Sequence, residues 1–312
     1  MIETHNLGMH FGPVTALKDA TFRVGQGEIL GLLGPNGAGK STIMKILTTY
    51  LRPSTGTATV CGFDVLRDPL KVRQKIGYLP ENLPLYPRME VGEYLDFVGQ
   101  ARGLHGTGLR QRLGWVLEKT GLTPMYRRPI GELSKGYRQR TALAQALVHD
   151  PEVIILDEPT TGLDPHQILE IRGLIKDLAA TKTVLFSTHI LQEVEAIADR
   201  VVIISQGTIK AQGTTDELAV KAGARTWGRA EIKAQGADIT ATLNAAGITD
   251  TEILREAEGW ARLRFTAPDP MAALEELSAL CTDKSWALRE LTLSGPSLED
   301  IFLALTRAEQ AA

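Results

Sequence analysis

The sequence predicts an α/β fold: a mainly parallel sheet covered by helices, with added antiparallel strands and a helical lobe, followed by a small α+β domain. Apolar runs of strand length recur between residues 29 and 205 and alternate with helical stretches, which is typical of parallel strand-helix-strand units. The first of these runs leads straight into a glycine-rich loop and a helix. The chain has 312 residues, more than the ~250 at which a single core stops growing, so a second domain is expected.

The elements of the first domain follow from apolar spacing and turn-forming residues. Residues 2–28 predict short antiparallel strands separated by glycine-containing turns. Continuous apolar runs predict buried strands, and apolar positions at helical spacing predict helices. The strands are expected at 29–33, 153–156, 183–187, 201–205 and 208–212. The helices are expected at 41–51, 90–123 and 167–180.

The second domain begins where the functional motifs stop, near Gly223. We therefore expect a first domain at 1–222, with its helical lobe at about 83–150, and an accessory α+β domain at 223–312. Strands are predicted at 230–234, 261–266 and 287–293, and helices at 239–246, 270–280 and 298–306.

Composition excludes several classes of protein. The formal net charge of −3 does not indicate affinity for nucleic acid, so no nucleic-acid partner is expected. The two cysteines, Cys61 and Cys281, are too far apart in the chain to indicate a disulfide framework or a metal site, which favours a reducing compartment. No apolar run reaches the ~18–20 residues that a membrane span needs. If the protein works at a membrane, another chain must cross it.

A phosphate-binding loop is the strongest motif. The segment Gly34-Pro35-Asn36-Gly37-Ala38-Gly39-Lys40-Ser41-Thr42 matches G-x-x-x-x-G-K-[ST] between a predicted strand and a predicted helix. Its glycines let backbone N–H groups turn towards phosphate oxygens, and the helix N-terminus adds partial positive charge. Lys40 supplies a full charge for the β- and γ-phosphates of ATP, and the Ser41 hydroxyl suits Mg²⁺.

Two carboxylates follow a later apolar strand. Asp157 and Glu158 end the run Val153-Ile154-Ile155-Leu156, at the edge of the sheet where the phosphate loop is expected. Asp157 would hold Mg²⁺ through its water shell, and Glu158 would orient and polarise the attacking water.

Further motifs, in a fixed order, give a resemblance to a known family. Leu133-Ser134-Lys135-Gly136-Tyr137 is similar to the LSGGQ signature of ATP-binding-cassette (ABC) proteins, and the acidic strand follows it. The resemblance covers about residues 2–220. In that family two cassettes pair head to tail, so it implies that Ser134 and Gly136 contact the γ-phosphate bound by a second copy.

The same resemblance assigns roles to three more residues. Asp164, in Thr161-Gly162-Leu163-Asp164-Pro165, lies in the segment that touches the partner copy (the D-loop). His189, after Ser187-Thr188, matches the switch histidine at the γ-phosphate. Phe11 matches the aromatic residue that stacks on adenine.

Two departures from the family pattern concern the site. Glu81 stands where the family usually has glutamine; a carboxylate can still bind Mg²⁺, more tightly than an amide, but while ionised it donates no hydrogen bond. Lys135 and Tyr137 replace glycine and glutamine of the signature, and Lys135 either adds charge near the γ-phosphate or faces solvent. Both departures resemble the exporters that pair with ABC-2-type permeases, including those of gliding motility.

The resemblance implies a function and its partners. The chain would be the ATP-hydrolysing subunit of an ABC-2-type exporter, cytoplasmic and peripheral to the inner face of the cell membrane. It would pair with a second copy and with a separate integral-membrane permease, contacted through residues 83–128. Alternatives are a soluble ABC ATPase of translation or DNA repair, and a regulator that binds ATP without turnover. A single uninterrupted cassette weighs against the first, and intact Lys40, Asp157, Glu158 and His189 weigh against the second.

Overall fold

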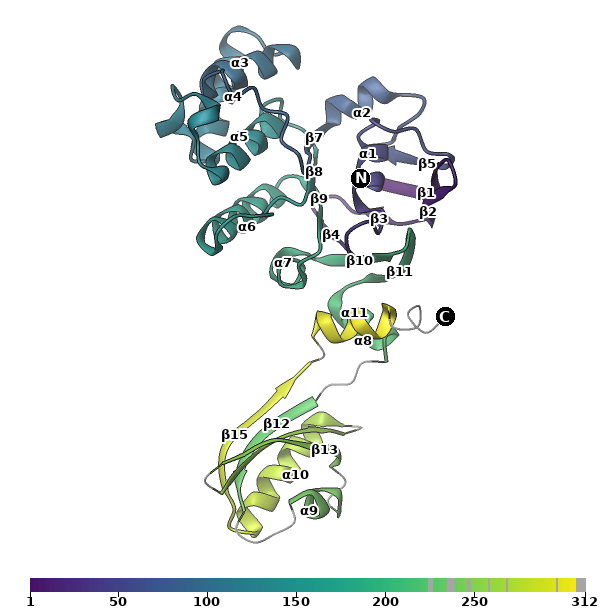
Figure 1. Cartoon of the computed structure of the whole chain (residues 1–312), viewed down its shortest axis with the longest axis vertical. Coiled ribbons are helices and arrows are strands. Elements are labelled where there is room, and N and C mark those ends of the chain that lie inside the picture. Colours follow the sequence, from purple (N-terminus) through teal and green to yellow (C-terminus); the bar gives the residue numbers. More distant parts are fainter. Residues whose placement is uncertain are drawn as a thin grey trace. The chain divides into compact units, whose positions relative to one another are not determined.

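Two compact units make up the chain. The computed structural model describes residues 1–223, 227–234, 239–245, 248–257, 259–267, 269–295 and 297–306 (Figure 1). The units are Met1–Thr215 and Asp216–Ala312. The expected boundary after residue 222 lies at the end of helix α8 (Thr215–Lys221), which begins at this division.

A six-stranded sheet forms the centre of the first unit, in the order β11-β10-β4-β9-β8-β7. The five strands from β10 to β7 in this order run parallel to one another. The edge strand β11 pairs with β10 antiparallel. The strands are β4 (Ile29–Leu33), β7 (Ile76–Leu79), β8 (Val153–Asp157), β9 (Thr183–Thr188), β10 (Arg200–Ser205) and β11 (Thr208–Gly213). Every residue of β4, β8 and β9 is buried, which explains their unbroken apolar sequences.

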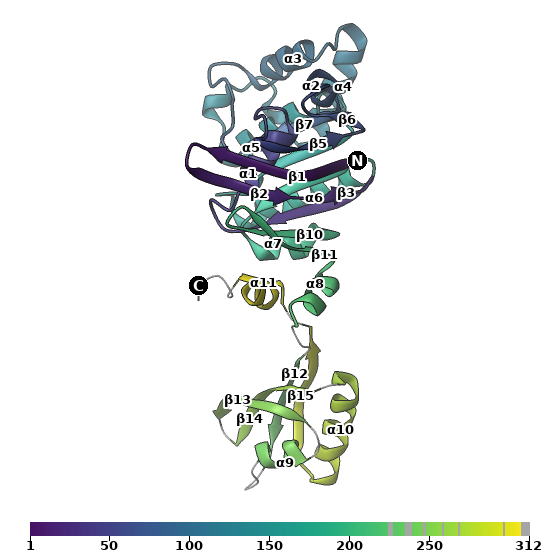
Figure 2. The same ribbon diagram turned by 90° about the vertical axis from the view of Figure 1, so that its right-hand side faces the viewer.

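An antiparallel sheet covers one side of this unit, in the order β2-β1-β5-β6 with β3 also paired to β1 (Figure 2). Its strands are β1 (Ile2–Phe11), β2 (Val14–Ala20), β3 (Arg23–Val24), β5 (Thr55–Val60) and β6 (Phe63–Asp64). Helix α1 (Lys40–Leu47) packs between the two sheets and buries Ile43, Met44, Ile46 and Leu47 in one shared core. This packing fixes the helix that follows the phosphate loop.

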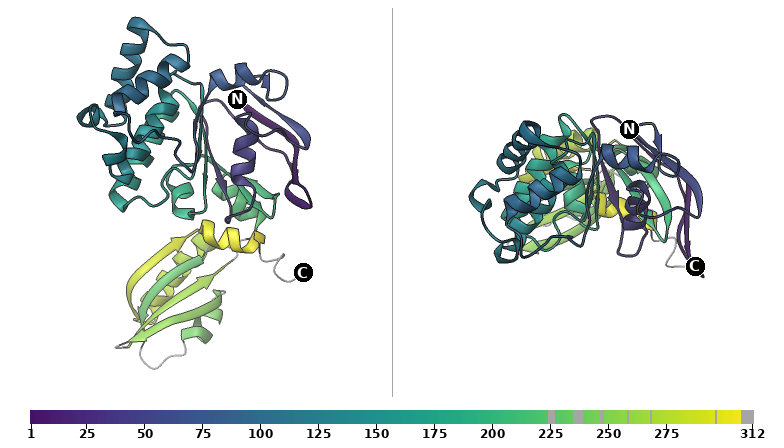
Figure 3. Two further views of the ribbon diagram at one scale, coloured as in Figure 1. Left: turned by 45° about the horizontal axis from the view of Figure 1, so that its top comes forward. Right: turned by 90° about the horizontal axis from the view of Figure 1, so that it is seen from above.

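Helices cover the other side. The helical lobe consists of α3 (Val91–Ala101), α4 (Gly106–Lys119) and α5 (Lys135–Leu147), which pack on one another and lie across the parallel sheet from β1 (Figure 3). The remaining helices of this unit are α2 (Pro69–Lys75), α6 (Pro165–Ala179) and α7 (Leu191–Ile197). The predicted α/β class, with parallel sheet, helical lobe and antiparallel strands, is confirmed.

The second unit contains a four-stranded antiparallel sheet in the order β13-β14-β12-β15. Helices α9 (Ile239–Ala245) and α10 (Pro270–Asp283) pack on one face through Leu243 and Leu277. The strands are β12 (Trp227–Lys233), β13 (Thr249–Ala257), β14 (Trp260–Thr266) and β15 (Ala287–Ser294), and helix α11 (Leu298–Thr306) follows. Residue 246, the last of the helix predicted at 239–246, lies outside the described residues. Among the described helices of the whole chain, none has both the length and the apolar character of a bilayer span.

Candidate functional site

The carboxyl ends of four neighbouring parallel strands bring the candidate residues together. In the order β4-β9-β8-β7, these strands lead into the phosphate loop, His189, Glu158 and Glu81 respectively. The register places Leu33 beside Thr188 and Asp157 beside Ser187, so the strands end at one level. Polar residues that lie far apart in the sequence therefore meet at one edge of the sheet.

The glycines of the phosphate loop are required by its geometry. Gly39 has φ of 107°, and a Cβ there would lie 2.8 Å from the carbonyl oxygen of Ala16. A Cβ on Gly34 would meet the carbonyl oxygen of Ile204. No side chain caps the N-terminus of α1, so its first backbone N–H groups remain available to an anion.

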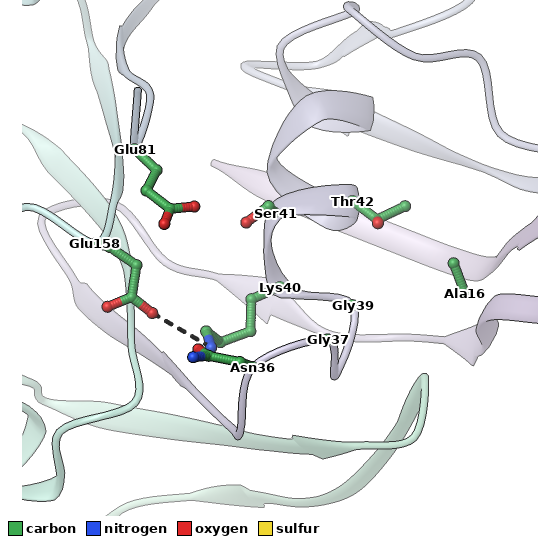
Figure 4. A pocket seen from close by; sticks show the side chains of 9 residues that line it. All are labelled: Ala16, Asn36, Gly37, Gly39, Lys40, Ser41, Thr42, Glu81 and Glu158. Carbon is green, nitrogen blue, oxygen red and sulfur yellow. Dashed lines mark ion pairs between the residues drawn. The ribbon is translucent and has the colours of Figure 1, made fainter. Parts of the chain in front are cut away.

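Lys40 is buried at the start of α1, with 5% of its surface exposed. Its Nζ donates hydrogen bonds to the carbonyl oxygens of Gly34 at 2.8 Å and Pro35 at 3.3 Å. The same ammonium lies 3.3 Å from Oε1 of Glu158, which is 8% exposed (Figure 4). A phosphate group in this loop would meet a cation already held by the loop's own carbonyls.

Glu158 lies between two basic side chains. Its Oε2 is 2.9 Å from Nδ1 of His189, and it also accepts a hydrogen bond from Thr161 Oγ1 at 3.3 Å. The backbone of Glu158 has φ of 51°, a left-handed conformation that non-glycine residues rarely adopt. Such strain collects at functional sites, and here it accompanies the turn that carries the carboxylate from the end of β8 to Lys40.

Asp157 is held by two hydroxyl groups. Its Oδ1 accepts from Ser187 Oγ at 2.7 Å and from Ser41 Oγ at 3.2 Å, and Ser187 Oγ also accepts from the backbone N–H of Glu158 at 3.0 Å. A hydroxyl and a carboxylate side by side are oxygen groups of the kind that Mg²⁺ prefers, so Ser41 would hold the ion and Asp157 would hold it through its water shell.

Glu81 adds a second carboxylate, which points towards Ser41 (Figure 4). It also lines a neighbouring cavity together with Ser41 and Asp157. In the described part of the chain, no group of three or more His, Cys, Asp or Glu side chains is arranged to hold a metal. A cation here would depend on one hydroxyl and carboxylates, completed by water and phosphate oxygens, which is how Mg²⁺ is commonly bound.

These residues surround a cavity of about 280 Å³. Its lining consists of Ala16, Asn36, Gly37, Gly39, Lys40, Ser41, Thr42, Glu81 and Glu158. Gly34, Pro35 and Ala38, which were also predicted to bind the nucleotide, are not part of this lining. Phe11 ends β1 with 46% of its surface exposed, so it is not a core residue, and it lies outside the lining.

The signature residues line a different cavity. It measures about 310 Å³ and shares no lining residue with the first. Ser134 caps α5 by accepting from Tyr137 N at 3.3 Å, and Asp164 caps α6 by accepting from Gln167 N at 2.9 Å. The structure thus brings Ser134, Gly136 and Asp164 together but places them apart from the Lys40 cavity.

Lys135 is exposed, which agrees with the alternative that it faces solvent, but its place beside Gly162 was not predicted. Its ammonium occupies the space that a side chain on Gly162 would need, so it lies against the D-loop of its own chain. Sequence reasoning also missed the supporting residues Ser187, Thr161 and Gln139, whose Nε2 donates to the carbonyl oxygen of Pro159 at 2.7 Å. Two of them carried a signal: Ser187 directly precedes Thr188-His189 at the end of a buried strand, and Thr161 opens the D-loop segment.

The chain is similar to proteins of one known family. Residues 17–161 match the family model described as ABC transporter. The linearmycin resistance ATP-binding protein LnrL of Bacillus subtilis is 34% identical over 308 residues, covering 98% of each chain. The doxorubicin resistance ATP-binding protein DrrA of Mycobacterium tuberculosis is 36% identical over 303 residues, covering 95% of this chain and 89% of its own.

A similar solved structure is that of a dimeric cassette. It is the ATP-binding cassette MJ0796 in a post-hydrolysis state bound to ADP and Pi, with a TM-score of 0.63 and 25% identity. The match covers 69% of this chain and 98% of that one.

Proposed function

The chain belongs to the ABC transporter family as an ATP-binding, ATP-hydrolysing protein, and from this premise we propose that it powers an ABC-2-type exporter through a separate permease. The observation that carries the catalytic part is the Lys40–Glu158–His189 cluster, with Glu158 3.3 Å from Lys40 and 2.9 Å from His189. The three residues follow three different strands, and they bring a cation for phosphate, a general base and a second basic side chain within reach of one another.

In the proposed reaction each residue acts on ATP directly. Lys40 and the N-terminal N–H groups of α1 bind the β- and γ-phosphates and stabilise the charge that develops on them. Glu158 orients the attacking water and accepts its proton, and His189 holds the γ-phosphate beside it. Ser41, Asp157 and Glu81 would hold Mg²⁺, which when bound neutralises charge on the phosphate oxygens.

A second copy would complete each site. Ser134, Gly136 and Asp164 line a cavity that shares no residue with the one around Lys40. Their proposed contact with ATP therefore requires the Lys40 cavity of another chain, in a head-to-tail pair. The dimeric structure of MJ0796 supports such pairing in the family.

The permease is proposed from the relatives and from one surface. LnrL and DrrA are named as resistance proteins, which agrees with export. Tyr86, Phe97 and Tyr126, in and beside the helical lobe, expose about half of their side chains, and the ring of Tyr86 lies 5.8 Å from that of Tyr94. An exposed aromatic group of this kind suits a protein partner. We place the chain at the inner face of the cell membrane through this contact.

Membrane recruitment tests the transporter assignment. The full chain is expressed alone or with the membrane protein of the adjacent reading frame, and membranes are separated by flotation. We expect the chain in the membrane fraction only with that protein, and release by the double variant Tyr86→Ala/Phe97→Ala. Equal recovery from both samples would contradict the assignment to a permease while leaving the ATPase assignment intact.

A further inference from the structure

One buried carboxylate near the site has no role in the chemistry proposed above. Glu193 lies in the first turn of α7, with 2% of its surface exposed. None of the ion pairs formed by the described residues includes it. A buried charge without a cation is costly unless hydrogen bonds stabilise it, so its two hydroxyl partners define what it does.

The two partners come from different loops. Thr160 Oγ1 donates a hydrogen bond to Oε1 of Glu193, and Thr188 Oγ1 donates to Oε2 at 2.6 Å. Both threonines are buried, with 4% and 0% of their surfaces exposed. Thr160 directly precedes the D-loop, and Thr188 directly precedes His189. Glu193 therefore bridges the loop after β8 and the loop after β9.

The hydrogen bonds of Glu193 and the contact between His189 and Glu158 connect the same two loops. On the cavity side, His189 and Glu158 connect the same two loops at 2.9 Å. On the buried side, Glu193 connects their neighbours, and the carbonyl oxygen of Thr188 also accepts from the N–H of Gly34 in the phosphate loop at 3.4 Å. A shift of Thr160 would thus move Thr188, and with it His189.

We propose that Glu193 is a positioning residue that couples the D-loop to His189, so that contact of a second copy with Asp164 sets the His189–Glu158 geometry. This rests on the proposed roles of Asp164, Glu158 and His189. In each copy, contact with the partner would then change the geometry of that copy's own hydrolysis site. The rate of hydrolysis would therefore depend cooperatively on the ATP concentration. The alternative is that Glu193 only supports the N-terminus of α7, where a carboxylate is also favourable.

Isosteric variants separate the two roles. In the full chain, Thr160→Val and Thr188→Val each remove one hydroxyl and keep the side-chain volume, and Glu193→Gln removes the charge. Thr120→Val is the matched control, because Thr120 is fully buried and its hydroxyl bonds the carbonyl oxygen of Val116, far from these loops in sequence. Steady-state ATPase, nucleotide affinity and thermal midpoint are measured for all four.

We expect kcat to fall about 10-fold to 100-fold in the three bridge variants, because small misplacement of catalytic groups has effects of this size. KM for ATP and nucleotide affinity should stay within about two-fold, the Hill coefficient should fall towards one, and Thr160→Val should add little to Glu193→Gln. The control should keep wild-type kcat. If Glu193→Gln does not fold, Thr160→Val decides, because the Thr188 hydroxyl also accepts from the N–H of Ile190 at 3.0 Å.

Unchanged kcat in folded Thr160→Val and Thr188→Val would overturn the coupling. The coupling would also be overturned if the losses of kcat simply correlated with the decrease in thermal midpoint, and if the control Thr120→Val followed the same correlation. Glu158→Gln distinguishes a failure of the proposed catalytic site from a failure of the Glu193 proposal. If this variant hydrolyses ATP normally, the proposed catalytic site is wrong. If it is inactive while the bridge variants are normal, only the role of Glu193 is wrong.

Discussion

Replacing Lys40 tests the catalytic cluster through stability as well as activity. Lys40→Ala leaves Glu158 buried without its ammonium partner, and breaking a buried pair in this way costs about 3–5 kcal/mol. Glu158 keeps His189 at 2.9 Å and Thr161 at 3.3 Å, so we expect a smaller loss of about 2 kcal/mol in the free energy of unfolding. Glu158→Gln should cost about 1 kcal/mol, because Lys40 keeps the carbonyl oxygens of Gly34 and Pro35.

The double variant is the informative measurement. Once Glu158 is neutral, removing Lys40 leaves no uncompensated charge, so Lys40→Ala in the Glu158→Gln background should cost about 1 kcal/mol or less. ATP affinity behaves differently: each charge-assisted bond is worth about 1.5–3 kcal/mol, so Lys40→Ala weakens binding by about 10-fold to 150-fold in either background. Urea unfolding followed by circular dichroism gives the stabilities, and titration calorimetry gives the affinities.

A surface ion pair supplies the control. Lys75 and Glu152 form an ion pair whose side chains are 37% and 48% exposed, so solvent screens it and the stability losses of their single variants should simply add. Additive stability losses for Lys40→Ala and Glu158→Gln would refute the buried pair. Normal turnover in Lys40→Ala would refute the phosphate-loop assignment.

Three further predictions concern other parts of the chain. Burial lowers the pKa of His149 to about 4 from 6.5, so His149 is neutral when folded, and the stability this gives is present above pH 6.5 and lost as the pH falls towards 4. His149→Gln should therefore reduce the loss of stability between pH 7 and pH 5 by about 2 kcal/mol, and a pH profile identical to that of the wild type would exclude the effect. Glu81→Gln should raise the Mg²⁺ concentration for half-maximal ATPase several-fold, as an amide is a weaker ligand, and an unchanged Mg²⁺ dependence would remove Glu81 from the metal site. A chain that ends at Ala222 should stay soluble and bind ATP, since the first unit has a core of its own, and insolubility would show that the boundary is misplaced.

The sequence predicted the gathering of the site because of a general property of parallel sheets. Strands that run parallel end at one edge, so motifs following 29–33, 153–156 and 183–187 had to meet. The unbroken apolar runs that marked these strands arise from complete burial. Strand β13 was missed for the opposite reason: it is an edge strand of polar sequence, TDTEILREA, without clear alternation.

Long-range side-chain partners were beyond prediction. Glu193 reads as an ordinary exposed residue of a short helix, and only the fold shows its two threonine donors. The left-handed backbone of Glu158 has no signature in its residue type, since it depends on the turn after β8. The position of Lys135 over Gly162 depends on how α5 packs beside the D-loop, which spacing alone does not specify.

The most direct test of the account is the ATP-dependent assembly of Glu158→Gln. The amide keeps the size of the side chain and removes the water-activating carboxylate, so hydrolysis should fall about 10²–10⁴-fold while Lys40 and Ser41 still bind Mg-ATP. Size-exclusion chromatography with light scattering should then show a monomer without nucleotide and a dimer with Mg-ATP, bridged from Lys40 of one copy to Ser134 of the other. The additional variant Ser134→Arg should abolish the dimer. Wild-type turnover by Glu158→Gln would contradict the catalytic role, and an inactive, ATP-bound variant that stays monomeric would contradict the head-to-tail pair.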